Sequence, residues 1–242
     1  MEKRKGKKKA FLAAVLVACL ALAGVMGVMA WYSSQSHITN TFTVGNIKPP
    51  TTDPTNPEGK DPLEPEKDPS EGGHKGQVSG NIVEDAWIPD SHIAAGSTVP
   101  KNPNIGISPK SDAAYVFVFV DNAIGQGTYF TLNENWKAVE GQAVEQGEVP
   151  KAYTSGLFMY VGPGNADAIM LEPNTAGDLD AWTGEVFSSV VAADNAVIKA
   201  SPKMKVSAYL VANTNETEKL SAANALDAAK TWAAGLEKLP QA

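Results

Sequence analysis

The chain has three histidines, the side chain that most often binds zinc or transfers protons near neutral pH. His37, His74 and His92 are widely separated, and each lies in turn-like or linker-like sequence. The chain has no His-Glu-x-x-His motif, in which a helix presents two zinc ligands and a general base on one face. The sequence therefore gives no support to a zinc site, and we expect neither a metal nor a catalytic residue.

A short acidic cluster offers the second candidate for metal chemistry. Asp178, Asp180 and Glu185 carry carboxylates, the ligands that calcium prefers. Their spacing is not that of a dedicated calcium loop, so we interpret the cluster as a solvated turn. Neither a nucleophile elbow nor a phosphate-binding glycine loop is present, and we expect no cofactor.

Four tryptophans in the second part of the chain have two open interpretations. Large aromatic rings stack on sugars, which would suit a carbohydrate-binding module. They also fill the core of a domain that has no disulfides, and this is the commoner role. We favour the core for these four residues, Trp87, Trp136, Trp182 and Trp232.

Residues 1–30 have the pattern of an export signal. Six Lys and Arg residues stand among the first nine residues, and residues 11–30 carry no charge. The basic tip stays in the cytoplasm while the apolar run enters the membrane. Val28 and Ala30 occupy the positions that a signal peptidase reads, so we predict cleavage before Trp31. The apolar run is also long enough to span a bilayer, and retention as an anchor stays the alternative.

Cleavage would remove much of the basic charge. Residues 31–242 contain 14 Lys and Arg against 26 Asp and Glu, a net charge of −12. Such an acidic chain argues against nucleic acid or anionic lipid as a partner, because both bind basic faces. Membrane contact is expected only through the signal segment before cleavage. The single cysteine, Cys19, leaves with the signal, so the secreted chain must be stabilised without disulfides.

Residues 49–76 form a proline-rich and acidic segment, with seven prolines and seven acidic residues. Its single large apolar residue is Leu63, so the segment cannot bury enough surface to offset the entropy of ordering. We interpret it as a disordered linker between residues 31–48 and a domain at residues 77–242. A short strand is predicted before the linker, formed by Thr41, Phe42, Thr43, Val44, Gly45, Asn46 and Ile47.

A strand of this length forms no stable sheet alone, so it must pair with an edge of its own domain or of a neighbour. The linker of 28 residues has a coil dimension of about 30 Å and a polyproline length of about 85 Å. Both edges are therefore within its reach.

The domain at residues 77–242 has the alternation of β-strands. In residues 114–122, Tyr115, Phe117 and Phe119 alternate with three valines, which predicts a central strand that is buried on both faces. Residues 204–213 place a second apolar series on one face, namely Met204, Val206, Ala208 and Leu210.

Prolines bracket two shorter stretches, residues 81–89 and 102–109, which predicts edge strands. Residues 221–238 have helical periodicity, with Ser221 placed as the N-cap. Many short strands with one terminal helix predict an all-β fold, a jelly-roll-like antiparallel β-sandwich with a C-terminal helix.

Two stretches resemble the TasA/camelysin family of proteins exported by Gram-positive bacteria. The first is the basic tip and apolar run, followed by the aromatic Tyr32 and a Thr-Phe-x-x-Gly strand that begins at Thr41. The second is residues 96–120, where a Gly-x-x-x-x-Lys-x-Pro turn leads to an Ala-Tyr-Val strand. Together they cover a minor part of the chain. The proline-rich insert, and Trp31 just after the predicted cut, depart from the family pattern.

The resemblance implies processing by a SipW-type signal peptidase and secretion to the extracellular matrix or the cell surface. It also implies a subunit of an amyloid-like biofilm-matrix fibre, with copies of itself and minor matrix subunits as partners. In this interpretation the strand at residues 41–47 completes the sheet of the next subunit and so builds a homopolymer.

Two other classes of function stay open. A monomeric surface adhesin would use the sandwich loops to bind sugars or proteins. A camelysin-like surface metalloprotease is suggested by the family alone, since the histidines do not support it. We therefore expect a structural protein rather than an enzyme.

Overall fold

A computed structural model describes most of the domain and one N-terminal strand. The predicted cleavage site at Val28, Ala30 and Trp31 and the linker at residues 49–76 lie outside the described residues. Within the described part of the chain, no helix is long and apolar enough to cross a membrane. For residues 33–41 only the backbone is described; the full set of described residues is 33–41, 78, 80–86, 91–107, 111–147, 149–174, 181–212 and 220–240.

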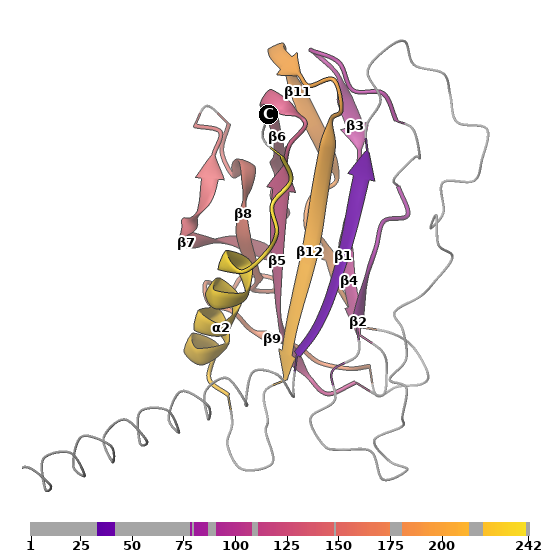
Figure 1. Ribbon diagram of the computed structural model, residues 1–242. Helices are drawn as coiled ribbons and strands as arrows, with labels where there is room; N and C mark the ends of the chain where they lie inside the picture. Colours follow the sequence, from indigo (N-terminus) through magenta and orange to yellow (C-terminus); the bar gives the residue numbers. More distant parts are fainter. Residues whose placement is uncertain are drawn as a thin grey trace, which may run out of the picture.

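The described residues form strands in series, followed by one helix (Figure 1). The strands are β1 (Ser33–Thr41), β2 (Gly80–Val83), β3 (Thr98–Pro100), β4 (Asn104–Ile107), β5 (Ala114–Asn122), β6 (Gly125–Thr131), β7 (Trp136–Glu145), β8 (Ala152–Tyr160), β9 (Met170–Leu171), β10 (Ala181–Glu185), β11 (Ser189–Ile198) and β12 (Lys203–Ala212). The helix is α2 (Ala222–Ala234), and Ser221 caps it by accepting a hydrogen bond from the backbone N–H of Asn224.

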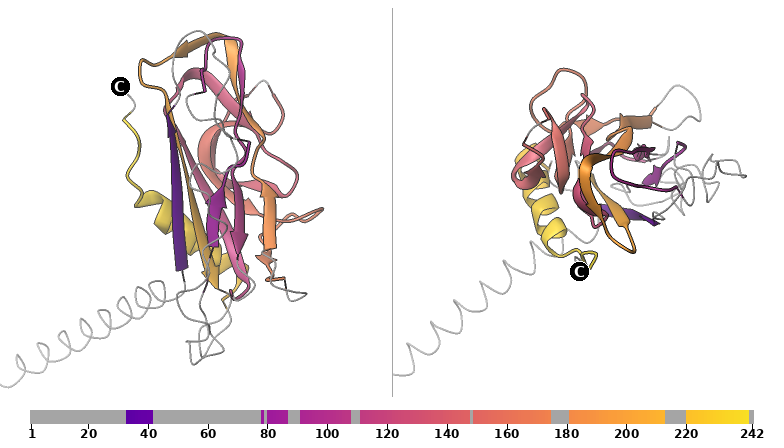
Figure 2. Two further views of the ribbon diagram at one scale, coloured as in Figure 1. Left: turned by 90° about the vertical axis from the view of Figure 1, so that its right-hand side faces the viewer. Right: turned by 90° about the horizontal axis from the view of Figure 1, so that it is seen from above.

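The strands build two antiparallel sheets, which confirms the predicted all-β sandwich. The larger sheet has 9 strands in the order β1-β12-β5-β8-β6-β11-β3, with β7 joined to β8 and β9 joined to β5. The smaller sheet has 3 strands in the order β10-β4-β2. Figure 2 shows the smaller sheet on one side of the larger sheet and α2 on the other.

The main core lies between the two sheets. Ile105 and Ile107 of β4 have no exposed surface and face valines of β5 and β12. An aromatic group extends this core, with Phe130 stacked on Phe187 at 4.4 Å between ring centroids. The alternation predicted for β12 is present, because its inward side chains are fully buried in this core, namely Met204, Val206, Ala208 and Leu210.

A second apolar layer lies between the larger sheet and α2. Phe117 and Tyr115 of β5 belong to it, as does Tyr209 of β12, whose ring stacks on Trp232 at 5.2 Å. The helix meets the sheet through small side chains, Ala225, Ala228, Ala229 and Ala233. This second layer explains why β5 carries apolar residues on both faces.

The two proline-bracketed strands have different positions. β2 lies at an edge of the smaller sheet, as predicted, but β4 pairs on both sides, with β2 and with β10. The prediction of an edge position for β4 was therefore wrong. Pro103 precedes the first paired residue of β4, Asn104, so it removes no N–H group from the ladder.

Phe117 and Phe119 allow a test of this layered arrangement. Phe117 has no exposed surface, whereas Phe119 is only partly buried on the same face of β5. We predict that Phe117→Ala lowers the free energy of unfolding by about 3–5 kcal/mol, because it leaves a cavity beneath the helix. Phe119→Ala should cost clearly less. Denaturant unfolding of both variants measures the difference, and equal costs would contradict this assignment of the second layer.

Candidate functional site: a sheet edge completed by the first strand

The first strand forms one edge of the larger sheet. β1 pairs with β12 along its whole length, from Ser33 opposite Val211 to Thr41 opposite Lys203. Figure 1 shows the two strands side by side, with β12 between β1 and β5. β1 therefore supplies one of the two neighbours of β12.

β1 has an unusual composition for a strand. Its sequence, Ser-Ser-Gln-Ser-His-Ile-Thr-Asn-Thr, contains Ile38 as its single large apolar residue. Ile38 is opposite Val206, which lies in the main core. Since so little apolar surface is available, the hydrogen bonds of the backbone ladder must supply most of the attachment, at about 0.5–1.5 kcal/mol net for each bond.

The position of this strand differs from the sequence prediction. The predicted strand at residues 41–47 shares only Thr41 with β1, and its other residues lie outside the described part of the chain. The prediction followed Phe42 and Val44, whose alternation is typical of a half-buried strand. The polar residues before them carry no such signal, yet they pair with β12.

β12 has the composition of an interior strand. Its inward side chains have no exposed surface, and its other edge pairs with β5 from Met204 to Ala212. Without β1, a long apolar strand would present unpaired N–H and C=O groups to water. Exposed edges of this kind recruit other strands. The edge of β12 is therefore a place where a strand is readily added.

The chain leaves β1 at Thr41 and enters β2 at Gly80, so residues 42–79 connect the two strands. β1 and β2 are also in contact across the edge of the sandwich.

Two chain crossings hold the smaller sheet to the larger one. Residues 101–103 join β3 of the larger sheet to β4 of the smaller, and residues 186–188 join β10 to β11 in the opposite sense. The crossings are bonded to each other, since the N–H of Lys101 donates to the carbonyl of Ser188 at 3.2 Å and that of Val186 to the carbonyl of Pro103 at 2.8 Å. The two sheets thus share one corner.

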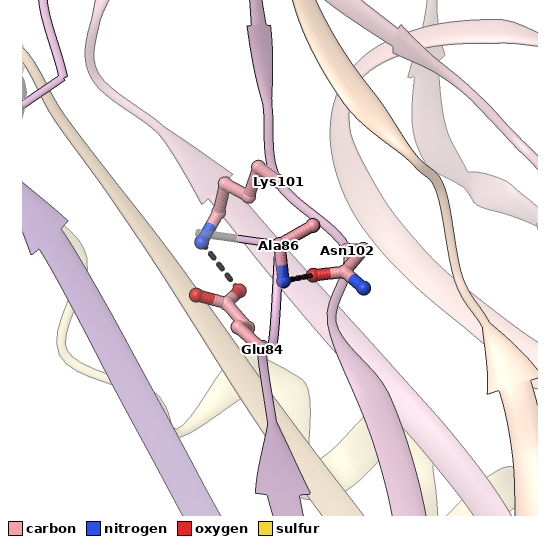
Figure 3. Close-up of polar contacts among 4 residues, drawn as sticks. All are labelled: Glu84, Ala86, Lys101 and Asn102. Atoms are coloured by element: carbon pink, nitrogen blue, oxygen red, sulfur yellow. Dashed lines mark hydrogen bonds and ion pairs between the residues drawn. The ribbon is translucent and has the colours of Figure 1, made fainter. Parts of the chain in front are cut away.

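A buried ion pair lies at this corner (Figure 3). The Nζ atom of Lys101 lies 2.5 Å from the Oε1 atom of Glu84, and the side chains are 0% and 2% exposed. Burial lowers the pKa of Lys101 below its usual range, and the Glu84 carboxylate opposes that shift. Glu84 directly follows β2, so the pair fixes the end of that strand to the crossing.

Asn102 extends the polar contacts of the corner. Its Oδ1 atom accepts a hydrogen bond from the N–H of Ala86 at 2.8 Å, as Figure 3 shows, and its Nδ2 atom donates to Glu185 at 3.0 Å. Asn102 also donates to Asp85. These contacts join the segment after β2 to the end of β10.

The corner was missed by the sequence analysis. Lys101 is the lysine of the Gly-x-x-x-x-Lys-x-Pro turn, which was noted only as a resemblance. Lysine is almost never fully buried unless it is paired, so no composition rule would have predicted its place. The spacing of Glu84 and Lys101 carries no pairing signal either.

The residues considered for chemistry are not gathered into one site. The side chain of His92 is described and half-buried, whereas only the backbone of His37 is described and His74 lies outside the described residues. Asp178 and Asp180 also lie outside, and Glu185 bonds to Asn102 and Ser188. In the described ranges, no group of three or more His, Cys, Asp or Glu side chains is placed to hold a metal ion.

The tryptophans have three different environments. Trp136 is buried in the main core, as expected, and Trp232 is partly buried against Tyr209. Trp182 is 37% exposed on β10, and Trp87 lies outside the described residues.

No family model matches the chain, and no curated protein or solved structure matches it either.

The ion pair at the corner gives a prediction for stability. Lys101→Met should lower the free energy of unfolding by about 3–5 kcal/mol, because it leaves the Glu84 charge buried without its lysine. The double variant Glu84→Met, Lys101→Met should recover most of that loss, since no buried charge remains. Urea unfolding measures both, with the exposed Lys137→Met as control. A loss for Lys101→Met no larger than the control would show that the pair does not stabilise the corner.

Proposed function

We propose that the chain is a secreted structural subunit of an extracellular biofilm-matrix or cell-surface fibre of a Gram-positive bacterium. Subunits join when β1 of one molecule occupies the edge of β12 in the next. The observation that carries this proposal is the contrast in composition between β1, which is polar, and β12, which is apolar. A polar strand, held mainly by its backbone, covers the edge of an apolar strand that would otherwise be unpaired.

Exchange between molecules preserves the pairing that the single chain makes. The ladder between β1 and β12 is the same in both arrangements, so the free-energy difference lies in chain entropy and in the linker. A tethered strand has an effective concentration near millimolar, which favours self-pairing in dilute solution. Proline stiffness in residues 49–76 would weaken self-pairing by holding β1 away from its own domain.

The geometry of exchange produces an open polymer. Each subunit gives a strand at one place and receives a strand at another, so the contact is heterologous, and it extends into an open polymer when the rotation between subunits does not close a ring. The export signal and the resemblance to the TasA/camelysin family support the same proposal. The strand that is exchanged is then β1 at Ser33–Thr41, upstream of the strand expected from the sequence.

Export requires processing of the N-terminus, which we predict between Ala30 and Trp31. N-terminal sequencing of secreted material should begin at Trp31. Ala30→Lys should block the cut, because a charged side chain cannot enter a small apolar pocket without a desolvation cost. Recovery of the intact basic tip in detergent-extracted membranes alone would instead indicate retention as an anchor.

The exchange of β1 is tested by fibre formation, followed by negative-stain microscopy at increasing concentration. Wild-type chains should polymerise, whereas a chain lacking residues 31–48 should stay folded and not polymerise. His37→Pro with Ile38→Pro should have the same effect, because one of two adjacent N–H groups on an edge strand points to its partner. His37→Ala with Ile38→Val, which keeps both N–H groups, is the matched control and should leave fibres unchanged.

Two synthetic peptides test which segment is exchanged, residues 33–41 or the residues that follow them. A peptide of residues 33–41 should bind the truncated chain and stop the growth of wild-type fibres, whereas a peptide of residues 42–48 should do neither. Fibres from the truncated chain would refute strand exchange but leave a fibre function standing. Wild-type chains that stay monomeric at every concentration would refute the fibre function itself.

A further inference from the structure

Trp182 differs from the other tryptophans of the described residues. It is 37% exposed on β10, an edge strand of the smaller sheet, whereas Trp136 is buried in the main core. Trp232 is covered on one ring face by Tyr209. The exposed part of the Trp182 indole is a flat apolar surface on which a ligand can pack.

The register of the smaller sheet shows which residues share the face of Trp182. Trp182 is opposite Gly106, and Glu185 is opposite Asn104. The residues that alternate with them on β4, Ile105 and Ile107, face the core. The outer face therefore carries Trp182 in one row of residues. The next row, about 7 Å further along the strands, carries Glu185 and Asn104. Gly106 contributes no side chain that would stand beside the indole.

The backbone next to Trp182 is fixed by an anchored β-bulge. The register of β10 shifts between Trp182 and Glu185, and Gly184 within the bulge has a φ of 77°. The Oγ1 atom of Thr183 donates to the carbonyl of Ile105 at 3.2 Å.

Two side chains at the start of β7 hold the same bulge, one from the residue just before the strand and one from its first residue. Asn135 donates to the carbonyl of Thr183 at 3.0 Å, and the indole N–H of Trp136 donates to the carbonyl of Gly184 at 3.3 Å. Bulges of this kind re-aim a side chain. Here the bulge, bonded to both sheets, sets the direction in which Trp182 leaves the strand.

We infer that the outer face of the smaller sheet is a carbohydrate-binding surface, with the indole of Trp182 as the stacking platform. The flat apolar face of a sugar ring packs on an indole, and its hydroxyl groups then reach the amide of Asn104 and the carboxylate of Glu185. The two carboxylate oxygens already accept hydrogen bonds from Asn102 and Ser188, and each keeps a second lone pair for a sugar hydroxyl. The row spacing of about 7 Å lets a chain of sugars contact both rows.

Charge decides which polysaccharide fits. The chain has a net charge of −7, and Glu185 and the exposed Asp85 lie on or beside this face. Polyanionic polymers would be repelled, whereas uncharged sugars or cationic amino sugars would be accepted. The ligand is therefore a polysaccharide of neutral or amino-bearing sugars. This inference does not depend on fibre formation.

Binding of defined hexasaccharides to the purified full chain tests the surface by calorimetry. The probes are hexasaccharides of glucose, of glucosamine and of galacturonic acid, which are neutral, cationic and anionic. We expect binding of the neutral or the cationic probe and none of the anionic one. Trp182→Ala should weaken binding at least tenfold, and Trp182→Phe, which keeps a smaller ring, should weaken it less.

The matched control is Val197→Ala, which removes exposed apolar surface from β11, where Val197 is 65% exposed. It should bind as the wild type does, and the melting temperatures of all variants should agree. The inference is overturned if neither the neutral nor the cationic probe binds the wild type, if the anionic probe binds equally well, or if Trp182→Ala weakens binding no more than Val197→Ala does.

Discussion

The inner face of β12 is the constraint on which the arrangement of this domain depends. Its four inward side chains are fully buried between the sheets, so the strand needs a neighbour on each edge. β5 fills one edge with an equally apolar strand. The other edge is filled by β1, whose side chains are almost all polar. The requirement is thus met by main-chain hydrogen bonding, which depends little on sequence, and this is why a serine-rich strand suffices.

The smaller sheet depends on a different interaction, the polar corner around Lys101. Two crossings carry the chain between the sheets at one place, and an almost fully buried ion pair lies beside them. Taking both charges out of water has a large cost, and their attraction repays it only with good geometry. The pair therefore selects one register between the end of β2 and the crossing, because a shifted register would leave both charges buried and apart.

An element of this fold could be predicted from the sequence where its own side chains determine its structure. β5 and β12 could be predicted because the burial of regular strand faces leaves an alternating pattern in the sequence. The helix could be predicted from its N-cap at Ser221 and from its helical periodicity. β1 could not, because its order comes from pairing with a distant strand and not from its own side chains. The run that contains β10 and β11 is continuous in β-propensity, and nothing in it marks the change of sheet near Val186. The burial of Lys101 could not be predicted, because only the fold brings its partner Glu84 next to it.

The short length of β2 has a mechanical consequence for a fibre joined by β1. Tension along such a fibre would enter each subunit through the ladder on β12 and leave it through residues 42–79, which join β1 to the start of β2 at Gly80. The ladder is loaded in shear, so its nine residue pairs resist together. β2 has only four residues at the edge of the smaller sheet, and it would be peeled off one bond at a time. Glu84 directly follows β2, and its buried ion pair with Lys101 would hold this part of the chain to the crossing. Separation of β2 would therefore stop before it reached the core.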